Sequence, residues 1–380
     1  MTFISLSPPK IEDDDIRAVN KVLKSGWLST GKVAHEFEDK FKQYVGAKQA
    51  LALNSCTAAL HLALIGHSIG KGDEVIVPTM TFAATANVVE LVGATPIFVD
   101  SEPYGFNIDA SRIGEKITER TKAVIPVHFG GMPCEMDSIW SLAYDNDVRV
   151  IEDCAHAIGS EYRGERIGAS FNLCCFSFYP TKNMTTIEGG MLTGSDEKMF
   201  KRLRKLSLHG MSKNAHLRFS DKGISHYNIE EPGYKYNMPD VSAALGLSQL
   251  KKIGRFNKIR ERYAKYLLER LDIPGIILPP KPKPFVKHSW HLFPLLINPK
   301  ETKMKRDKVL GLLKKNGIGT GIHYKALHLH PYYRNKYKLR ASDYPRATEI
   351  SENTFSIPFS HSMTWKEVER VADVIIKILR

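Results

Sequence analysis

The feature that most constrains this chain is a regular alternation of strand and helix patterns along its first two-thirds. Short apolar runs rich in Val, Ile or Phe are typical of parallel strands buried on both faces. They cover residues 74–77, 96–99, 123–127, 149–152, 174–178 and 190–193. Helical patterns cover residues 12–23, 34–44, 57–64, 85–92, 136–145 and 196–206. The alternation predicts an α/β fold with a mainly parallel sheet covered by helices.

A smaller α/β unit is expected toward the C-terminus. One long helical pattern opens at Pro239-Asp240 and runs to about residue 271, before a segment, 274–284, that holds five prolines. Beyond it we expect a strand near 291–297, a helix near 306–315, a strand near 319–324 and a last helix from about residue 364. The expected domains are therefore residues 1–250, which are large, and residues 251–380, which are smaller.

The charge balance indicates which kinds of binding partner the chain is suited to. The net charge is +13, from 54 basic and 41 acidic residues. The basic residues are spread out and no nucleic-acid motif accompanies them, so a solvated surface and a small anionic substrate fit better than a nucleic acid. A run of about 18 apolar residues, which a membrane span needs, is absent from the sequence.

The cysteines argue against disulfides and metals. The chain has five, an odd number, without a CxxC pair or a cluster of histidines around them. This pattern fits reduced thiols in a cytoplasmic protein better than a disulfide framework or a zinc site, and we expect no metal. The first thirty residues lack the apolar core of a signal peptide.

Four stretches carry candidate chemistry, and the first is an apolar strand that runs through Asn54 into a helix. The free amides at that helix start can bind an anion, and the hydroxyls of Ser55 and Thr57 can add hydrogen bonds to a phosphate. Ser and Thr are also good helix N-caps, so a purely structural role stays open.

The second stretch places Asp153 at the end of a buried strand, with His156 three residues later. Ligands of open α/β sheets bind at that edge. A partly buried carboxylate needs a partner, and a protonated pyridine nitrogen is one. An Asp that caps a helix beside a core His is the structural alternative.

The third stretch ends a buried strand in Ser177 and continues through Pro180 to Lys182 in a polar turn. A lysine that projects from the strand edge toward Asp153, partly desolvated, can form a Schiff base. Gly189-Gly190 then permits a tight turn into the next strand. In the fourth stretch, residues 78–85, Phe82 can stack on a pyridine ring, although ordinary packing would explain it alone.

These stretches together resemble the nucleotide-sugar aminotransferases of the DegT/DnrJ type, in order and over essentially the whole chain. The matching residues are 54–60, 78–85, 152–157, 176–183 with 188–190, 233–238 and 317–324. The resemblance implies the aspartate aminotransferase fold (fold type I), which binds pyridoxal 5'-phosphate. It also implies a homodimer with shared active sites.

Residue by residue, the resemblance implies that Lys182 is the Schiff-base lysine and Asp153 the partner of the pyridine nitrogen. His156 matches a residue beside the ring and Phe82 the stacking aromatic. The implied phosphate contacts are Ser55, Cys56, Thr57, Ala58 and Ser177. Many members read Gly-Tyr-Asn-Tyr-Arg in a segment that reaches the partner subunit's phosphate. This chain has Lys235 and Asn237 there, and both are candidates.

Two further stretches match positions that line the nucleotide-sugar site: Gly26, Trp27, Leu28 and Ser29, and His323, Tyr324 and Lys325. The implied reaction moves an amino group from an amino acid, by resemblance L-glutamate, to a keto-sugar nucleotide. The stretches 289–293 and 317–323 look most like enzymes that act on UDP-4-keto sugars, such as the enzyme forming 4-amino-4-deoxy-arabinose. Bacterial surface-polysaccharide or amino-sugar biosynthesis is the implied context.

Other functions stay open on the same fold, and amino-acid decarboxylation is one of them. A few relatives carry His in place of the lysine and dehydrate sugars, and Lys182 argues against that activity. A regulatory protein that binds the cofactor without catalysis is a further alternative, and the intact pair of Lys182 and Asp153 argues against it.

Overall fold

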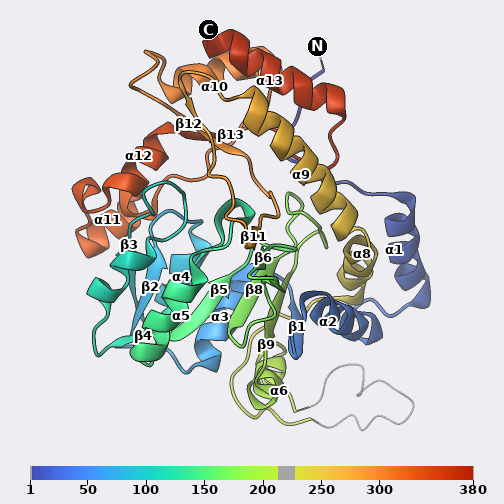
Figure 1. The fold of residues 1–380 in the computed structure, drawn as a ribbon. Helices are drawn as coiled ribbons and strands as arrows, with labels where there is room; N and C mark the ends of the chain where they lie inside the picture. Colours follow the sequence, from blue (N-terminus) through green and yellow to red (C-terminus); the bar gives the residue numbers. More distant parts are fainter. Residues whose placement is uncertain (1, 213–226, 380) are drawn as a thin grey trace.

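The computed structural model describes residues 2–212 and 227–379. Figure 1 shows one large sheet with helices on both faces, and a second group of helices and short strands above it. In this view α13 and α10 lie at the top, and α9 runs from there down toward α8. The N-terminal segment joins this upper group, since Ile4 N donates to Gly317 O and Phe359 N donates to Leu6 O.

The large sheet has seven strands in the order β1-β9-β8-β5-β4-β2-β3. Only β9 runs antiparallel to its neighbours; the other neighbouring pairs are parallel. The strands are β1 Gln49–Leu53, β2 Glu74–Pro78, β3 Thr95–Val99, β4 Thr121–Val124, β5 Arg149–Asp153, β8 Leu173–Ser177 and β9 Gly190–Gly194. The predicted α/β class with a mainly parallel sheet is confirmed.

Helices cover both faces of this sheet and bury its alternate side chains in two cores. One core joins the sheet to α2 (Lys32–Val45), α5 (Met136–Asp145) and α8 (Asp240–Leu250). The other joins it to α3 (Cys56–Gly66), α4 (Ala84–Leu91) and α6 (Glu197–Leu206). Val150 and Ile151 of β5 point into different cores, as the two-residue period of a strand requires. The helices predicted in this region are found within two or three residues of their expected ends.

The smaller sheet is antiparallel, in the order β10 (Ile276–Ile277), β12 (Pro294–Ile297) and β13 (Thr354–Ser356). A third core packs it against α9 (Ile253–Arg270), α10 (Arg306–Lys315) and α13 (Trp365–Leu379). A fourth core joins Leu296 and Ile350, the latter from α12 (Pro345–Asn353), to Phe129 and Met80 from loops of the large sheet. This last core holds the two sheets together beside the edge where the candidate site lies. The boundary expected between residues 250 and 251 stays a prediction.

The single helix predicted over residues 239–271 is wrong, because the chain forms α8 and α9 with a break at Lys251-Lys252. The apolar pattern continues across the break, so periodicity alone does not reveal it. At the break, Lys252 Nζ donates to Asp14 Oδ1 (2.8 Å) and Asp15 Oδ1 (2.6 Å), at the start of α1 (Asp13–Ser25). The turn therefore places Lys252 in an ionic contact with a segment far away in the sequence.

The strand predicted near residues 319–324 is also wrong. This segment makes single bridges, Ile318 with Ile4 and Gly321 with Ser356, and then leaves the sheet. Some elements were not predicted from the sequence: α11 (Pro331–Tyr337), α12 and a small sheet of β11 (Val286–Lys287), β6 (Glu161–Tyr162) and β7 (Glu165–Arg166).

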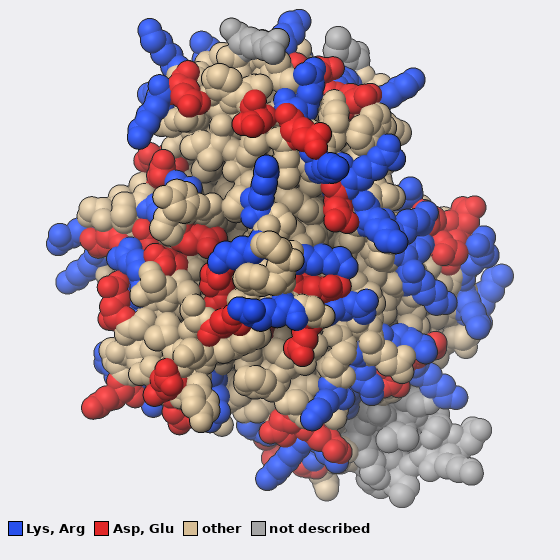
Figure 2. Space-filling model, viewed as in Figure 1, with Lys and Arg blue, Asp and Glu red and all other residues tan. Residues whose placement is uncertain are grey.

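Basic and acidic side chains are mixed over the face shown in Figure 2, with Asp and Glu among the Lys and Arg. All five cysteines are buried and free. Among the described helices, none has both the length and the apolarity that crossing a bilayer requires.

Candidate active site

The candidate residues gather at the edge of the large sheet where the parallel strands end. Asp153 is the last residue of β5 and Ser177 the last of β8, and these strands are hydrogen-bonded neighbours. Lys182 follows β8 in a turn in which its N–H donates to Tyr179 O (2.9 Å). Parallel strands bring their carboxyl ends to one edge, which is where open α/β sheets bind ligands.

The Lys182 side chain is partly buried in this turn. Burial lowers the pKa of its ammonium group to about 8, although Cys56 and the negative charge of Asp153 act in the opposite direction. An amine with this pKa is substantially neutral, and therefore nucleophilic, near pH 8.

Asp153 is 5% exposed and its carboxylate is held at both oxygens. Thr85 Oγ1 donates to Oδ2 (2.9 Å), and the N–H of Ala155 donates to Oδ1 (3.1 Å). Burial raises the pKa of this carboxyl, opposed by those two hydrogen bonds and by the charge of Lys182. Asp153 and Lys182 are therefore close enough for each to change the pKa of the other.

His156 lies beside this pair and is fixed in one tautomer. Gly130 N–H donates to His156 Nδ1 (3.1 Å), so the proton of the neutral ring is on Nε2, which faces the Tyr324 hydroxyl at 3.3 Å. Burial, with the charge of Lys182 nearby, keeps the pKa of His156 well below its usual range. The ring is therefore neutral at physiological pH.

The loop with Tyr324 closes the other side of the site. Phe82 is 61% exposed, and its ring lies 5.9 Å from that of Tyr324. His323 Nδ1 pairs with Ser356 Oγ (2.8 Å), and burial beside Lys182 lowers the pKa of His323 to about 4. Lys325 is exposed at the end of this stretch. An exposed aromatic ring among buried polar groups is suited to stack on a flat ligand.

The start of α3 supplies amide groups at the same edge. Ser55 is the N-cap of this helix, and its Oγ accepts from Ala58 N (3.1 Å), so the capping role left open by the sequence is present. Cys56 is buried and its thiol donates to Cys175 O (3.3 Å), whereas Thr57 is exposed. The Ala58 side chain is buried. The helix dipole favours an anion at this end.

Gly190 brings β9 against that helix start. A Cβ built at Gly190 would lie 2.4 Å from the carbonyl carbon of Ser55 and 2.5 Å from Cys56 N, so a larger residue does not fit. Ser177 pairs with Gly190 across the sheet and is partly buried, with its Oγ 3.5 Å from Tyr179 N. The sequence predicts a tight turn at this glycine, and the structure adds a close approach of two backbones.

A second group of candidates gathers around residues 235–240. Lys235 Nζ donates to Asn237 Oδ1 (2.7 Å), and Asn237 Nδ2 donates to Thr30 Oγ1 (2.6 Å). Asp240 N donates to Ser29 O (3.3 Å). In the stretch before Ser29, Gly26 ends α1 with φ 77°, Trp27 is partly buried and Leu28 is exposed. The structure thus brings the end of this stretch, Ser29 and Thr30, against Asn237 and Asp240.

Several buried polar residues of the site were missed from the sequence. His291 is 3% exposed and its ring centroid lies 4.4 Å from that of His156. Asn183, directly after Lys182, bonds to His291 Nδ1 (3.2 Å). Thr85 holds Asp153, as described above. A histidine and an asparagine inside otherwise apolar stretches are the signals that could have indicated these positions, because buried polar groups need partners.

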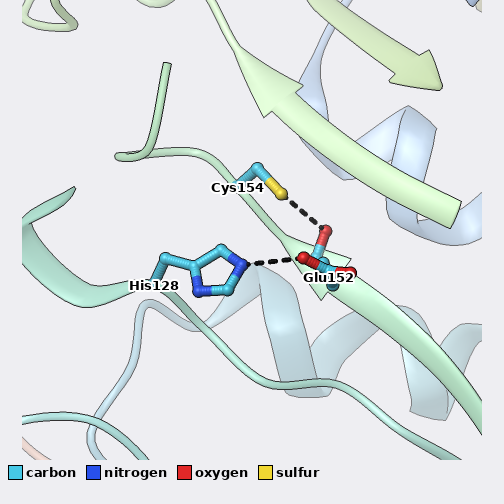
Figure 3. A group of neighbouring side chains, drawn as sticks. All are labelled: His128, Glu152 and Cys154. Atoms are coloured by element: carbon cyan, nitrogen blue, oxygen red, sulfur yellow. Dashed lines mark hydrogen bonds and ion pairs between the residues drawn. The ribbon is translucent and has the colours of Figure 1, made fainter. Parts of the chain in front are cut away.

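His128, Glu152 and Cys154 form a buried group (Figure 3), and the last two flank Asp153 in the sequence. Cys134 N–H donates to His128 Nδ1 (3.1 Å), so the other ring nitrogen carries the proton and donates to Glu152 Oε2 (3.0 Å). The Cys154 thiol donates to Glu152 O (3.4 Å). Glu152 Oε1 accepts from Ser170 Oγ (2.9 Å) and Asn172 Nδ2 (2.8 Å).

These hydrogen bonds use the atoms that a metal ion would need as ligands. The group therefore acts as a buried polar network. It joins the loop after β4 to the end of β5, where His128 N–H donates to Asp153 O (3.2 Å).

Known sequences match this chain over nearly its full length. Residues 9–376 match the DegT/DnrJ/EryC1/StrS aminotransferase family. The chain is 43% identical over 384 residues to spore coat polysaccharide biosynthesis protein SpsC of Bacillus subtilis, covering 100% of this chain and 97% of that protein. It is 40% identical over 382 residues to UDP-4-amino-4-deoxy-L-arabinose–oxoglutarate aminotransferase of Shewanella sediminis, covering 99% and 98%.

Solved structures match the fold of this chain as well. The sugar aminotransferase Spr1654 from Streptococcus pneumoniae, described as putative, superposes in its PMP form with a TM-score of 0.91 and 33% identity, covering 99% of this chain and 100% of that one. The same protein is also known in a PLP form. The chain belongs to the DegT/DnrJ/EryC1/StrS aminotransferase family. It is an aminotransferase that depends on pyridoxal phosphate.

Proposed function

We propose that this enzyme transfers an amino group from L-glutamate to the keto group of a nucleotide sugar, with Lys182 holding pyridoxal phosphate covalently through Nζ. The observation that carries this proposal is the pair at the sheet edge. A lysine with a pKa lowered to about 8 lies within electrostatic reach of a buried carboxylate. A flat ring between the two would meet a nucleophile on one side and an anion on the other.

The residues present fit the cofactor. Burial of Asp153 makes its charge costly, and a protonated pyridine nitrogen would compensate for it. We assign the ring contacts to Phe82 and His156. We assign the phosphate to the α3 N-terminus with Ser55, Cys56, Thr57, Ala58 and Ser177. The backbone approach at Gly190 keeps that end of the helix clear of side chains.

The chain's own groups then have defined tasks. When bound, pyridoxal phosphate supplies a sink for the electrons released as the donor's α-proton leaves. Lys182 Nζ takes that proton as a base and returns it as an acid. Asp153 keeps its partner nitrogen charged. The neutral His156 and the Tyr324 hydroxyl hold one hydrogen-bond direction throughout, because neither group titrates near neutral pH.

We further propose a UDP-4-keto sugar, or another nucleoside-diphosphate keto sugar, as acceptor. The name of the Shewanella relative supports this choice. A net charge of +13 suits a substrate that carries a diphosphate. Gly26, Trp27, Leu28, Ser29, His323, Tyr324 and Lys325 are the proposed lining residues. The product would serve polysaccharide or amino-sugar biosynthesis, as the name of SpsC suggests.

We also propose a homodimer in which each subunit completes its partner's site. The support is that the Lys235 side chain is exposed, while its carbonyl accepts from Asn54 Nδ2 (3.1 Å), next to the N-cap of α3. Lys235 and Asn237 would reach the phosphate bound by the other subunit. The buried free cysteines suit a reducing compartment, and we place the enzyme in the cytoplasm.

The test follows the colour of the bound cofactor. The purified chain is loaded with pyridoxal phosphate, treated with L-glutamate, and then given a panel of keto-sugar nucleotides one at a time. Glutamate should change the visible absorbance in a single turnover, and one or a few of the panel should restore it. No change with glutamate would contradict the proposal and favour a non-catalytic binder. A dehydrated sugar without nitrogen would favour a dehydratase.

A further inference from the structure

The turn that carries Lys182 is fixed by the residue after it. The Asn183 side chain is buried, 1% exposed, and all of its polar atoms are used. Its Nδ2 donates to Ser289 O (2.9 Å) and to Asn257 Oδ1 (3.0 Å). Asn257 is oriented independently, because its own Nδ2 donates to Ile158 O (3.0 Å). Asn183 Oδ1 therefore remains as the acceptor for His291.

That assignment fixes the proton on His291. With Oδ1 of Asn183 at 3.2 Å, His291 Nδ1 carries the hydrogen and donates it. Burial, with His156 and Lys182 nearby, keeps the pKa of His291 well below its usual range, so the ring is neutral. His291 thus contributes a hydrogen-bond donor and a ring face to the site, and no charge.

The ring face of His291 lies on His156, with centroids 4.4 Å apart and planes at 38°. Gly130 joins the same two residues through the backbone. Its carbonyl accepts from His291 N (2.8 Å), and its N–H donates to His156 Nδ1 (3.1 Å). His291 therefore contacts both the Lys182 turn and the imidazole beside it.

Arg260 holds His291 from the other side. This arginine of α9 is fully buried, and its Nη1 donates to the carbonyls of Trp290 (3.2 Å), His291 (3.1 Å) and Phe359 (3.1 Å). The segment with His291 is thereby fixed to α9 and to the chain before α13. A side chain supported in this way can hold its neighbours in one geometry.

We propose that His291 and Asn183 are positioning residues, which orient the Lys182 turn relative to His156 through one buried hydrogen bond and one ring contact. The inference rests on the proposed function, because it concerns the same lysine. Neither residue is assigned a contact with substrate or cofactor. Their effect is to keep Nζ of Lys182 aligned during proton transfer, a step in which misplacement by about 1 Å can cost about 100-fold in rate.

The test compares His291→Phe with His288→Phe in the full-length holoenzyme. Both histidines belong to one segment and contact an aromatic or imidazole ring. Each histidine makes one hydrogen bond through Nδ1. In His288 this nitrogen accepts from Trp290 N (2.8 Å). Only His291 is bonded to the residue after Lys182. We expect His291→Phe to lower kcat about 10- to 100-fold with little change in KM for the sugar, and His288→Phe to stay within about 2-fold.

A second variant, Asn183→Ala, removes the same bond from the other side and keeps the test valid if His291→Phe folds poorly. If the two residues act through each other, the double variant will be no slower than the slower single variant. Equal kcat for the His291 and His288 variants, additive losses in the double variant, or a loss confined to KM would each overturn the positioning role.

A readout without cofactor separates this inference from the proposed function. Lys182 in the cofactor-free chain is labelled with an amine-directed reagent over a range of pH, and the labelled peptide is measured by mass. The midpoint should lie near pH 8 in wild type and His288→Phe. It should rise in His291→Phe and Asn183→Ala, as water enters a loosened turn. An unchanged midpoint contradicts the positioning role even if wild type fails to react with glutamate.

Discussion

The two sides of the active site are built in different ways. On one side Asp153, Ser177 and the start of α3 are placed directly by strands and a helix of the large sheet. On the other side His291, His323 and Tyr324 lie on irregular segments between small-sheet elements, joined by side-chain bonds such as the 3.3 Å contact of Tyr324 with His156. The sheet side therefore holds the buried carboxylate Asp153, and the buried groups of the loop side are neutral donors and rings.

This difference suggests a division of work. The charged groups need fixed positions, because an electrostatic effect depends on preorganised geometry. On the loop side, His323 and Tyr324 bond to Ser356 and His156 and not to Lys182 or Asp153, so these two positions can change without moving that pair, which suits a surface that selects the substrate. Substitution of Lys182 or Asp153 should therefore cost more rate than substitution of His323 or Tyr324.

The largest loss should come from Lys182→Ala, which removes the nucleophile and the proton carrier together. We expect turnover to fall about 1,000-fold or more, as when a covalent nucleophile is removed. Turnover and the mass of the borohydride-reduced protein give the result. Lys182→Arg keeps a positive charge without a nucleophilic amine and should be equally slow. Full rates in either variant would remove Lys182 from its assigned role.

Asp153→Asn tests the charge on the sheet side. Without a carboxylate the partner nitrogen loses its proton, so kcat should fall about 100- to 1,000-fold while the fold stays intact. Asp100→Asn is the matched control, since Asp100 is also buried after a strand and accepts from Arg346 N (3.0 Å) and Ala347 N (2.7 Å). The control should lower Tm and leave kcat unchanged. Equal kcat in both variants would contradict the role of Asp153.

Tyr324→Phe tests the loop side. The variant removes one hydrogen bond to neutral His156, so kcat should fall only about 3- to 10-fold. Tyr263→Phe, which loses a buried bond to Met363 O (2.6 Å) away from the site, serves as control for stability and should keep its rate. A loss for Tyr324→Phe as large as that for Asp153→Asn would show that the two sides do not divide the work.

Ser55→Ala should have the smallest effect. The N-cap of α3 loses its hydrogen bond to Ala58 N, which costs about 1 kcal/mol of folding free energy. Asp196→Ala removes the equivalent bond to Met199 N (2.9 Å) from α6, far from the phosphate side. Denaturant unfolding should give similar losses for both. Cofactor titration should show weaker binding only for Ser55→Ala, and equal affinities would confine Ser55 to capping.

Much of the sheet side could be predicted from the sequence, because local patterns determine it. The apolar runs that end at Asp153 and Ser177 indicate buried parallel strands, and the edge where such strands end is a known place for ligands. Lys182 follows from the same pattern, since Pro180 predicts a turn between the end of the strand and the lysine. Where a residue lies relative to the end of a strand can be predicted from the residues next to it in the sequence.

The loop side was not predictable in the same way. His291 and Asn183 are 108 residues apart, and their contact depends on how the second sheet packs against the first. The segment before Tyr324 has a strand-like sequence, but its partners are Ile4 and Ser356, from opposite ends of the chain. The break in the helix at Lys252 likewise depends on Asp14 and Asp15. Contacts between residues so far apart in the sequence produce no periodic pattern from which they could be predicted.

The burial of the five cysteines has a practical consequence for studying this enzyme. Each thiol has a pKa raised above its ordinary value, so little reactive thiolate forms at neutral pH. The native chain should therefore react very slowly with maleimide dyes. A single cysteine introduced at a solvent-facing site, for example by Tyr144→Cys where the side chain is 89% exposed, would then carry one fluorophore per subunit. Subunit exchange could be followed by energy transfer without first removing the native thiols.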